Sequence, residues 1–241
     1  MSQFQVKGYR SRNKIMTNLT TNSVYATGWL LAILTLVFFS GSAFSFELLS
    51  LKKSKDFALA KCINELASKN HWLTAKDVTK ITCHGKGIQN LDDLTPFVNL
   101  KALSLFNNKI SKADLRAFTQ LTSLNIANNK LSHIQVTHLS QLHTLYLFKN
   151  QLTTLNFSGL SQLKKLRITN NKLFNIDISE LASLEKAYFF DNKLEDLSLT
   201  GLEKLKFIEL RQNPMPDEVY DRYDELEGIT IIHDGNADDW K

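Results

Sequence analysis

The chain has 241 residues, of which 43% are hydrophobic and 22% charged, with only three prolines and nine glycines. This composition excludes collagen-like and low-complexity disordered classes and leaves one or two globular domains. The formal net charge is +5, but the first 45 residues contain four basic residues and no acid, so the remainder is close to neutral. The charge therefore gives no support for nucleic-acid binding by the whole protein.

The first element in chain order is an apolar segment at residues 29–39, WLLAILTLVFF. Eleven residues are too few to span a bilayer, which needs about 20, but they are typical of the apolar region of a secretory signal. Ala43 and Ser45 supply small residues at the two positions that a signal peptidase requires. We therefore expect residues 1–45 to be a signal peptide and the mature chain to begin near Phe46.

Several alternatives remain open for this N-terminal segment. Residues 25–51 could instead form an uncleaved membrane anchor, which would then be the chain's only contact with a membrane. The sequence does not distinguish a start at Met1 from one at Met16, and it does not separate periplasmic from extracellular export. It predicts an exported protein in either case.

The next element is an N-terminal helical cap, expected within residues 46–77. Apolar residues from Asp56 to Ser68 recur at helical spacing, and Cys62 lies among them. The second cysteine is Cys83. Two cysteines after an export signal favour one disulfide, and free thiols are the alternative. A zinc site is not expected, because the ligand spacings CxxC and HxxxH are absent. A disulfide closing a loop of about 20 residues would stabilise the cap by roughly 3 kcal/mol.

An internal repeat dominates the rest of the chain. Six copies of the pattern LxxLxLxxN follow at a spacing of 21 residues, without an insertion or deletion. The asparagines that end the copies are Asn108, Asn129, Asn150, Asn171, Asn192 and Asn213. Val78, Ile81, Cys83 and Ile88 look like a degenerate first copy, 22 residues earlier. A fixed period of this length predicts a solenoid, here over residues 78–215.

This pattern resembles the leucine-rich repeat family in a short bacterial form. The resemblance implies a solenoid fold and no particular activity, although adhesins and invasion factors occur among exported bacterial proteins of this appearance. The residues predict the same fold independently. The two apolar residues of each xLxLx segment alternate with polar ones, which is the period of a half-buried strand. The fold class expected is a β-rich solenoid with a parallel concave sheet, an extended convex side and α-helical caps at both ends.

The fifth copy has Ala187 and Phe189 at the inward positions, a small residue beside a large one that together conserve core volume. The repeated asparagine should be structural, because its amide can satisfy backbone groups left unpaired at the corner of the coil. Residues 216–241 should form the C-terminal cap and an acidic tail. A helix is expected from Asp217 to Glu227 and a last strand from Ile229 to Ile232.

The outward positions of the strands define the candidate binding surface, which we call the sheet face. Six of its eighteen residues are aromatic, more than strand preference alone explains. Exposed rings interleaved with arginine are typical of binding hot spots; the alternative is that the rings lie against one another and only shield the sheet. The predicted ligand-binding residues are Phe106, Tyr146, Phe148, Lys165, Arg167, Lys186, Tyr188, Phe190, Phe207 and Arg211.

A second feature is a stripe of lysines directly after the asparagines. Its members are Lys109, Lys130, Lys172 and Lys193, interrupted by Gln151. The stripe could attract an acidic partner, or it could only keep the solenoid soluble. No catalytic motif, metal-ligand spacing or cofactor-binding loop is present, so we expect no enzyme activity, no catalytic or metal site and no cofactor.

The predicted function is an exported, non-enzymatic recognition module that binds a protein or peptide on its aromatic and basic sheet face. One alternative is a binder of acidic glycans such as lipopolysaccharide, which would use the rings for sugar stacking and the lysines for phosphates. Another is a structural component of the cell envelope. Nucleic acid is not an expected partner.

Overall fold

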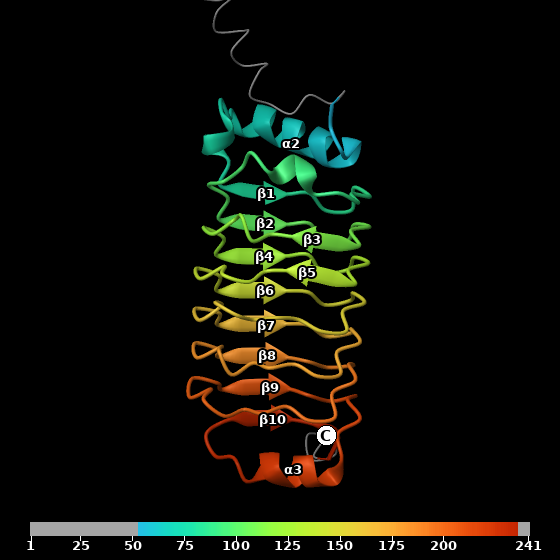
Figure 1. Ribbon diagram of the computed structural model, residues 1–241, viewed down its shortest axis with the longest axis vertical. Helices are drawn as coiled ribbons and strands as arrows, with labels where there is room; N and C mark the ends of the chain where they lie inside the picture. Colours follow the sequence, from blue (N-terminus) through green and yellow to red (C-terminus); the bar gives the residue numbers. More distant parts are fainter. Residues whose placement is uncertain (1–52, 236–241) are drawn as a thin grey trace, which may run out of the picture. The chain divides into compact units, whose positions relative to one another are not determined.

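The computed structural model describes residues 53–235. The expected signal peptide, the alternative anchor and the last residues of the acidic tail lie outside this range. Within it, the chain winds into a solenoid in which each turn adds one strand to a parallel sheet (Figure 1). No helix within this range combines the length and apolarity needed to cross a bilayer.

The main sheet of the described range has eight strands of three residues each. In spatial order they are β1 (Lys80–Thr82), β2 (Ala102–Ser104), β4 (Ser123–Asn125), β6 (Thr144–Tyr146), β7 (Lys165–Arg167), β8 (Lys186–Tyr188), β9 (Phe207–Glu209) and β10 (Thr230–Ile232). Equivalent residues of successive repeats pair directly, as Leu103 pairs with Leu124 and Leu124 with Leu145. The 21-residue period therefore sets the register of the sheet.

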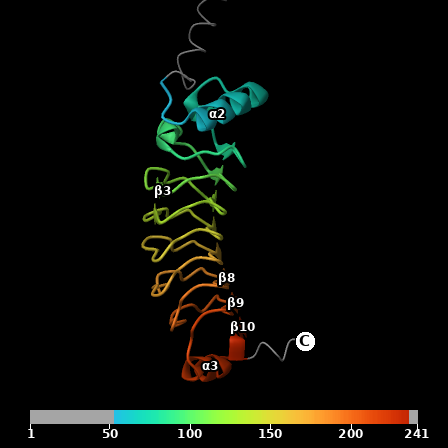
Figure 2. The same cartoon turned by 90° about the vertical axis from the view of Figure 1, so that its right-hand side faces the viewer.

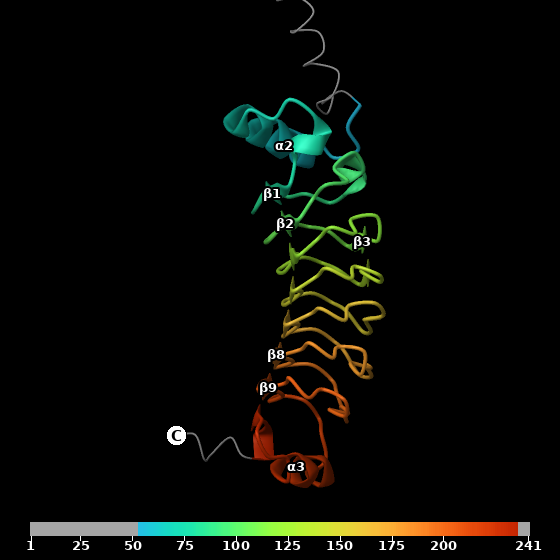
Figure 3. The ribbon, with the colours of Figure 1, turned by 90° about the vertical axis from the view of Figure 1, so that its left-hand side faces the viewer.

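The opposite side of the coil is extended, as the sequence predicts. It contains a short two-stranded sheet of β3 (Lys112–Asp114) and β5 (His133–Gln135), and one 3-10 turn, η2 (Asp92–Leu94). Side views place the main sheet and β3 on opposite sides of the coil (Figures 2 and 3). Both sides bury their apolar residues between them, so the core is a single column along the solenoid.

The inward positions of every predicted strand are buried. Leu103, the most exposed inward residue of the six regular copies, is only 1% accessible. Ala187 and Phe189 in the fifth copy are both fully buried, in agreement with the predicted exchange of volume. The degenerate first copy is also confirmed, since Val78, Ile81, Cys83 and Ile88 all lie in the core.

The repeated asparagines, from Asn108 to Asn213, lie one above another along the solenoid, and we call them the asparagine column. Their side chains bond each turn to the one before it. The side chain of Asn171 donates to the carbonyl oxygens of Leu147 and Ile168 at 3.1 and 3.0 Å, and its Oδ1 accepts from the backbone N of Leu152 at 3.1 Å. The same pattern recurs at Asn150 and Asn192. Their structural role is therefore confirmed.

The residue before each of these asparagines has a left-handed backbone. Asn107, Asn128, Lys149, Asn170, Asp191 and Gln212 have φ values between 54° and 59°. Asparagine and aspartate tolerate this conformation better than most residues with side chains. The turn therefore favours the Asn-Asn pairs of the repeat, and Lys149 is the least suited occupant of the column.

The N-terminal end of the core is covered by α2 (Phe57–Asn70), with Trp72 packed against it and followed by the 3-10 turn η1 (Ala75–Asp77). Cys62 on α2 and Cys83 after β1 form a disulfide, as the sequence favours. The carboxylate of Asp56 caps α2 by accepting from the backbone N of Leu59 at 3.0 Å, and its second oxygen accepts two backbone N–H groups at 2.7 and 2.9 Å.

The other end of the core is covered by α3 (Asp217–Asp224) and by β10. The helix ends three residues before the predicted end at Glu227. Leu226 lies beyond the helix and is 41% exposed. Tyr220 stacks on the ring of His233, with centroids 4.7 Å apart and the ring planes 5° from parallel. This pair fixes the segment after β10 against α3.

Candidate functional site

The ten predicted binding residues all lie on the sheet face, because the strands have the predicted register. Their six rings are partly buried, and Arg167 and Lys186 are exposed. The expectation of fully exposed rings is therefore too simple. Partial burial arises from contacts between side chains of neighbouring strands.

At the N-terminal end of the sheet face, Phe106 and Phe148 contact each other across an intervening strand. Their ring centroids are 6.1 Å apart, and the residue between them in the column, Ala127, is fully buried. His84, which the sequence analysis did not include, extends this group. Its ring meets Phe106 edge-on at 5.9 Å, and its Nε2 lies 2.7 Å from the hydroxyl of Ser104. The sequence could have identified His84, because it lies 22 residues before Phe106 and so occupies the equivalent outward position in the degenerate first copy.

Two cations lie over rings at the centre of the face. The guanidinium carbon of Arg167 is 4.8 Å from the centroid of Phe148 and 5.9 Å from that of Tyr188. The ammonium of Lys165 lies 5.6 Å from the ring of Tyr146. All three distances fall within the range of cation–π attraction, which contributes about 0.5 to 1 kcal/mol at an exposed site. These contacts limit the freedom of two long side chains before any ligand arrives.

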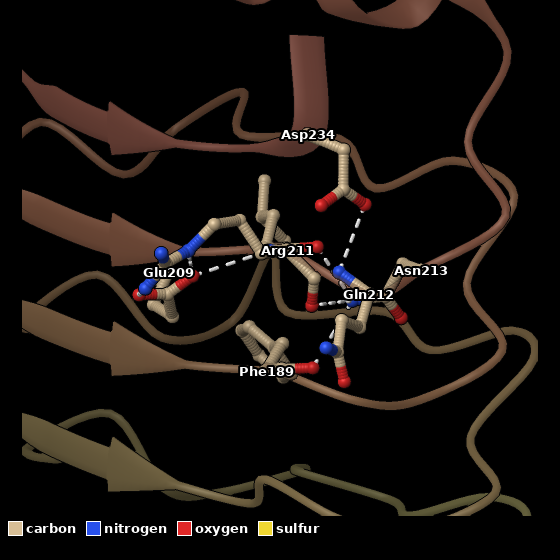
Figure 4. Close-up of polar contacts among 7 residues, drawn as sticks. Phe189, Glu209, Arg211, Gln212, Asn213 and Asp234 are labelled. Carbon is tan, nitrogen blue, oxygen red and sulfur yellow. Dashed lines mark hydrogen bonds and ion pairs between the residues drawn. The ribbon is translucent and has the colours of Figure 1, made fainter. Parts of the chain in front are cut away.

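The C-terminal end of the sheet face combines a ring pair with an ion pair. Tyr188 and Phe207 have centroids 5.2 Å apart. Arg211 donates from Nε and Nη2 to the two carboxylate oxygens of Glu209, at 2.8 and 2.9 Å (Figure 4). These hydrogen bonds raise the pKa of Arg211. The face as a whole carries net positive charge, because its four cations, Lys165, Arg167, Lys186 and Arg211, outnumber its one acid, Glu209.

The other two predicted binding residues, Phe190 and Lys186, form none of these ring, cation–π or ion-pair contacts. Phe190 is partly buried, and Lys186 projects into solvent. The ten residues and His84 lie on or just after β1, β2, β6, β7, β8 and β9, and β4 contributes none of them. We find no separate subsites of different chemistry on this face.

Two cavities lie away from the sheet face. One of about 320 Å³ lies between the last repeat and the C-terminal cap and is lined by Leu199, Tyr223 and Leu226, among others. Another, of about 410 Å³, is polar and lies beside β3 and β5. Within residues 53–235, no group of three or more His, Cys, Asp or Glu side chains is placed to hold a metal ion.

Comparison with known proteins agrees with this architecture. The model of the Leucine Rich Repeat family matches residues 120–142. The chain is similar to the crystal structure of an internalin, InlF, from Listeria monocytogenes, with 21% identity and a TM-score of 0.51 over 76% of this chain and 64% of that one. It therefore spans less than two thirds of that relative's length. No curated protein sequence gives a significant match.

A second solved structure, internalin C2 (InlC2) from the same organism, matches with 24% identity and a TM-score of 0.51 over 74% of this chain and 93% of that one. Identities this low show the fold alone. Together with the repeat and the asparagine column, they show that the chain has a leucine-rich repeat fold.

Proposed function

We propose that the chain is a non-enzymatic recognition module that binds a protein or peptide on its sheet face. The observation that supports this most directly is the row of partly buried rings that hold Lys165 and Arg167 in place. Binding costs side-chain entropy for each flexible group that becomes ordered. Rings and cations that are already ordered reduce that cost, and aromatic residues with arginine are the commonest hot spots of protein interfaces.

The proposal is tested by replacing Tyr146, Phe148, Tyr188 and Phe190 singly with Ser and measuring capture of partners from envelope and culture medium. We expect the best anchor to lose about 1 to 2 kcal/mol or more of binding free energy. Phe174→Ser is the matched control, because Phe174 is 60% exposed and lies outside the sheet face. Partner capture unchanged in all four variants, with lower melting temperatures, would show that the rings only shield the sheet.

A glycan binder is the alternative function, since rings also stack on sugars. If lysines bind the phosphate or carboxylate groups of a glycan, the affinity should fall steeply as ionic strength rises. The affinity of an aromatic protein interface should be much less sensitive to salt. Titrating salt against any captured partner separates the two. A purely structural role in the envelope would leave no saturable partner at all.

We propose in addition that the protein is exported. The disulfide between Cys62 and Cys83 supports this, because disulfides persist in oxidising compartments. The signal segment predicts a mature N-terminus within a few residues of Phe46. N-terminal sequencing of protein recovered outside the cytoplasm checks this, and an intact N-terminal segment on membrane-bound protein would favour the anchor instead.

A further inference from the structure

A row of lysines follows the edge of the solenoid that the strand arrowheads point toward in Figure 1. Six successive turns each place one exposed lysine there, and the row is longer than the stripe predicted from sequence, because Lys86 and Lys149 also belong to it. The lysine row is Lys86, Lys109, Lys130, Lys149, Lys172 and Lys193. At about 4.8 Å per strand it is about 24 Å long.

The backbone of the row is held at fixed spacing. The backbone N–H groups of Lys130 and Lys172 donate to carbonyl oxygens of the preceding turn, at 2.9 and 2.8 Å. The ammonium groups, in contrast, form no ion pair with other described residues. None of the ion pairs or cation–π contacts within residues 53–235 involves a lysine of the row. Among the turn residues themselves, Asp191 is the one acid.

Amide side chains accompany the lysines. Asn107, Asn128 and Asn170 have left-handed backbones in the same turns. Asn128 donates its amide N–H to Oδ1 of Asn107 at 2.8 Å, and Asn170 donates its amide N–H to the carboxylate of Asp191. Each amide both donates and accepts hydrogen bonds. Three of the six turns of the row therefore combine a lysine with an asparagine amide.

From this juxtaposition we propose that the lysine row binds a linear polysaccharide of acidic sugars, lying along the solenoid axis and separate from the sheet face. Carboxylates of the polymer pair with the lysines, and its hydroxyl groups exchange hydrogen bonds with the asparagine amides. The length of one sugar residue in such a polymer is close to the strand spacing. An extended acidic peptide fits less well, because its side chains on one face repeat at about 6.6 Å and it has no hydroxyl groups for the amides.

The test uses an oligogalacturonate of six residues, with binding measured by calorimetry at several salt concentrations. We expect a single site whose affinity falls as salt rises, and weaker binding of the dimer. Replacing Lys109, Lys130, Lys172 and Lys193 together with Gln should raise the dissociation constant at least tenfold. The fold tolerates this residue at the position, since Gln151 already occupies it in the third copy.

Two further variants distinguish the row from general charge and from a folding defect. The charge-matched control replaces four exposed lysines elsewhere, Lys101, Lys112, Lys204 and Lys206, with Gln, and should change the dissociation constant less than twofold. Asp191→Asn should tighten binding several-fold, because it removes the acid from the row and keeps a residue suited to the left-handed backbone. A gain of affinity cannot arise from misfolding.

Several results would overturn the proposal. These are no binding of the hexamer, an equal loss in the charge-matched control, or binding of poly-glutamate or oligothymidylate as tight as that of the hexamer. Loss of hexamer binding on replacing Tyr146 and Phe148 with Ser would assign the polysaccharide to the sheet face instead. Because the row and the face are mutated separately, failure here leaves protein recognition by the sheet face untouched.

Discussion

The two ends of the solenoid solve the same problem with different chemistry. Each end must cover a core that the next repeat would otherwise bury. At the N-terminal end, α2 is joined to the first repeat by a disulfide and by the carboxylates of Asp56 and Asp93, which accept backbone N–H groups. At the C-terminal end, α3 is held by the aromatic group of Tyr220, Tyr223 and His233.

The difference shows which forces each cap depends on. The N-terminal cap is sensitive to reduction and to acid, because its ties are a covalent bond and ionised carboxylates. The C-terminal cap depends on packing, since its rings are buried and its ion pair between Arg222 and Asp196 is exposed. Conditions that loosen one end should therefore leave the other intact, and four variants test this contrast.

The largest effect is expected from Tyr223→Ala at the C-terminal cap. Tyr223 is buried, and its hydroxyl donates to the carbonyl of Leu197 at 2.8 Å. Truncation of a buried ring should lower the free energy of unfolding by about 3 to 5 kcal/mol. Tyr223→Phe removes only the hydrogen bond and should cost about 1 kcal/mol. Chemical denaturation of both variants measures this, and equal losses would mean that packing is not what holds the cap.

Tyr223 should also make the free energy of unfolding depend on pH in the alkaline range. Burial raises the pKa of Tyr223 above its ordinary value of 10.0. The neutral phenol is therefore favoured in the folded state, so this stabilisation is complete below about pH 10 and is lost as the pH rises further. Tyr223→Phe should lack that alkaline loss.

Replacing Cys62 and Cys83 together with Ala should lower the free energy of unfolding by about 3 kcal/mol, because the cross-link no longer restricts the unfolded chain. Hydrogen exchange should show faster opening of α2 and β1, with α3 protected as before. Peptide mapping without reduction checks the link itself. Uniform loss of protection along the whole solenoid would contradict the independence of the two ends.

Asp56→Ala should cost about 1 to 2 kcal/mol, because α2 loses its N-terminal cap. Burial raises the pKa of Asp56, but hydrogen bonds from Gln89, Asn90, Leu59 and Ala58 outweigh it, and the pKa is lowered from its ordinary 3.8. The stabilisation is thus present above about pH 4 and lost as the pH falls through the folded-state pKa. Asp56→Asn should also lose this pH dependence, because the amide does not titrate, and it should retain part of the stability, because its single oxygen can accept either from Leu59 or from Gln89 and Asn90.

Arg222→Gln should have the smallest effect, below about 1 kcal/mol. The guanidinium lies 2.6 Å from Asp196, but both side chains are more than half exposed, at 55% and 56%. Solvent therefore weakens their attraction. Melting in low and high salt measures the contribution, and a loss as large as that of Tyr223→Ala would show that charge, and not packing, secures this cap.

The parts of the structure that follow from periodicity could be predicted from the sequence. The strand register, the inward residues, the role of the asparagines and the placement of the ten sheet-face residues all depend on a 21-residue period without insertions. The amphipathic pattern before the first repeat predicts a helix that contains Cys62. Its partner Cys83 followed from the inward position of the degenerate copy.

Other features could not be predicted, because they depend on contacts between residues far apart in the chain. The hydrogen bonds from residues 54–56 to Asp93 join segments 37 to 39 residues apart. The stacking of Tyr220 on His233 depends on how the chain turns after α3. Which cation lies over which ring on the sheet face depends on side-chain conformations, and the strand pattern does not determine these.

The asparagine column has a consequence for how such a molecule can change its length. The side-chain amide of Asn171 reaches only its own turn and the one before it, and each of its neighbours does the same. Duplicating or excising a block of 21 residues therefore leaves the asparagine of each remaining turn with equivalent backbone partners. The number of repeats then determines the length of the solenoid, and its two caps need not change.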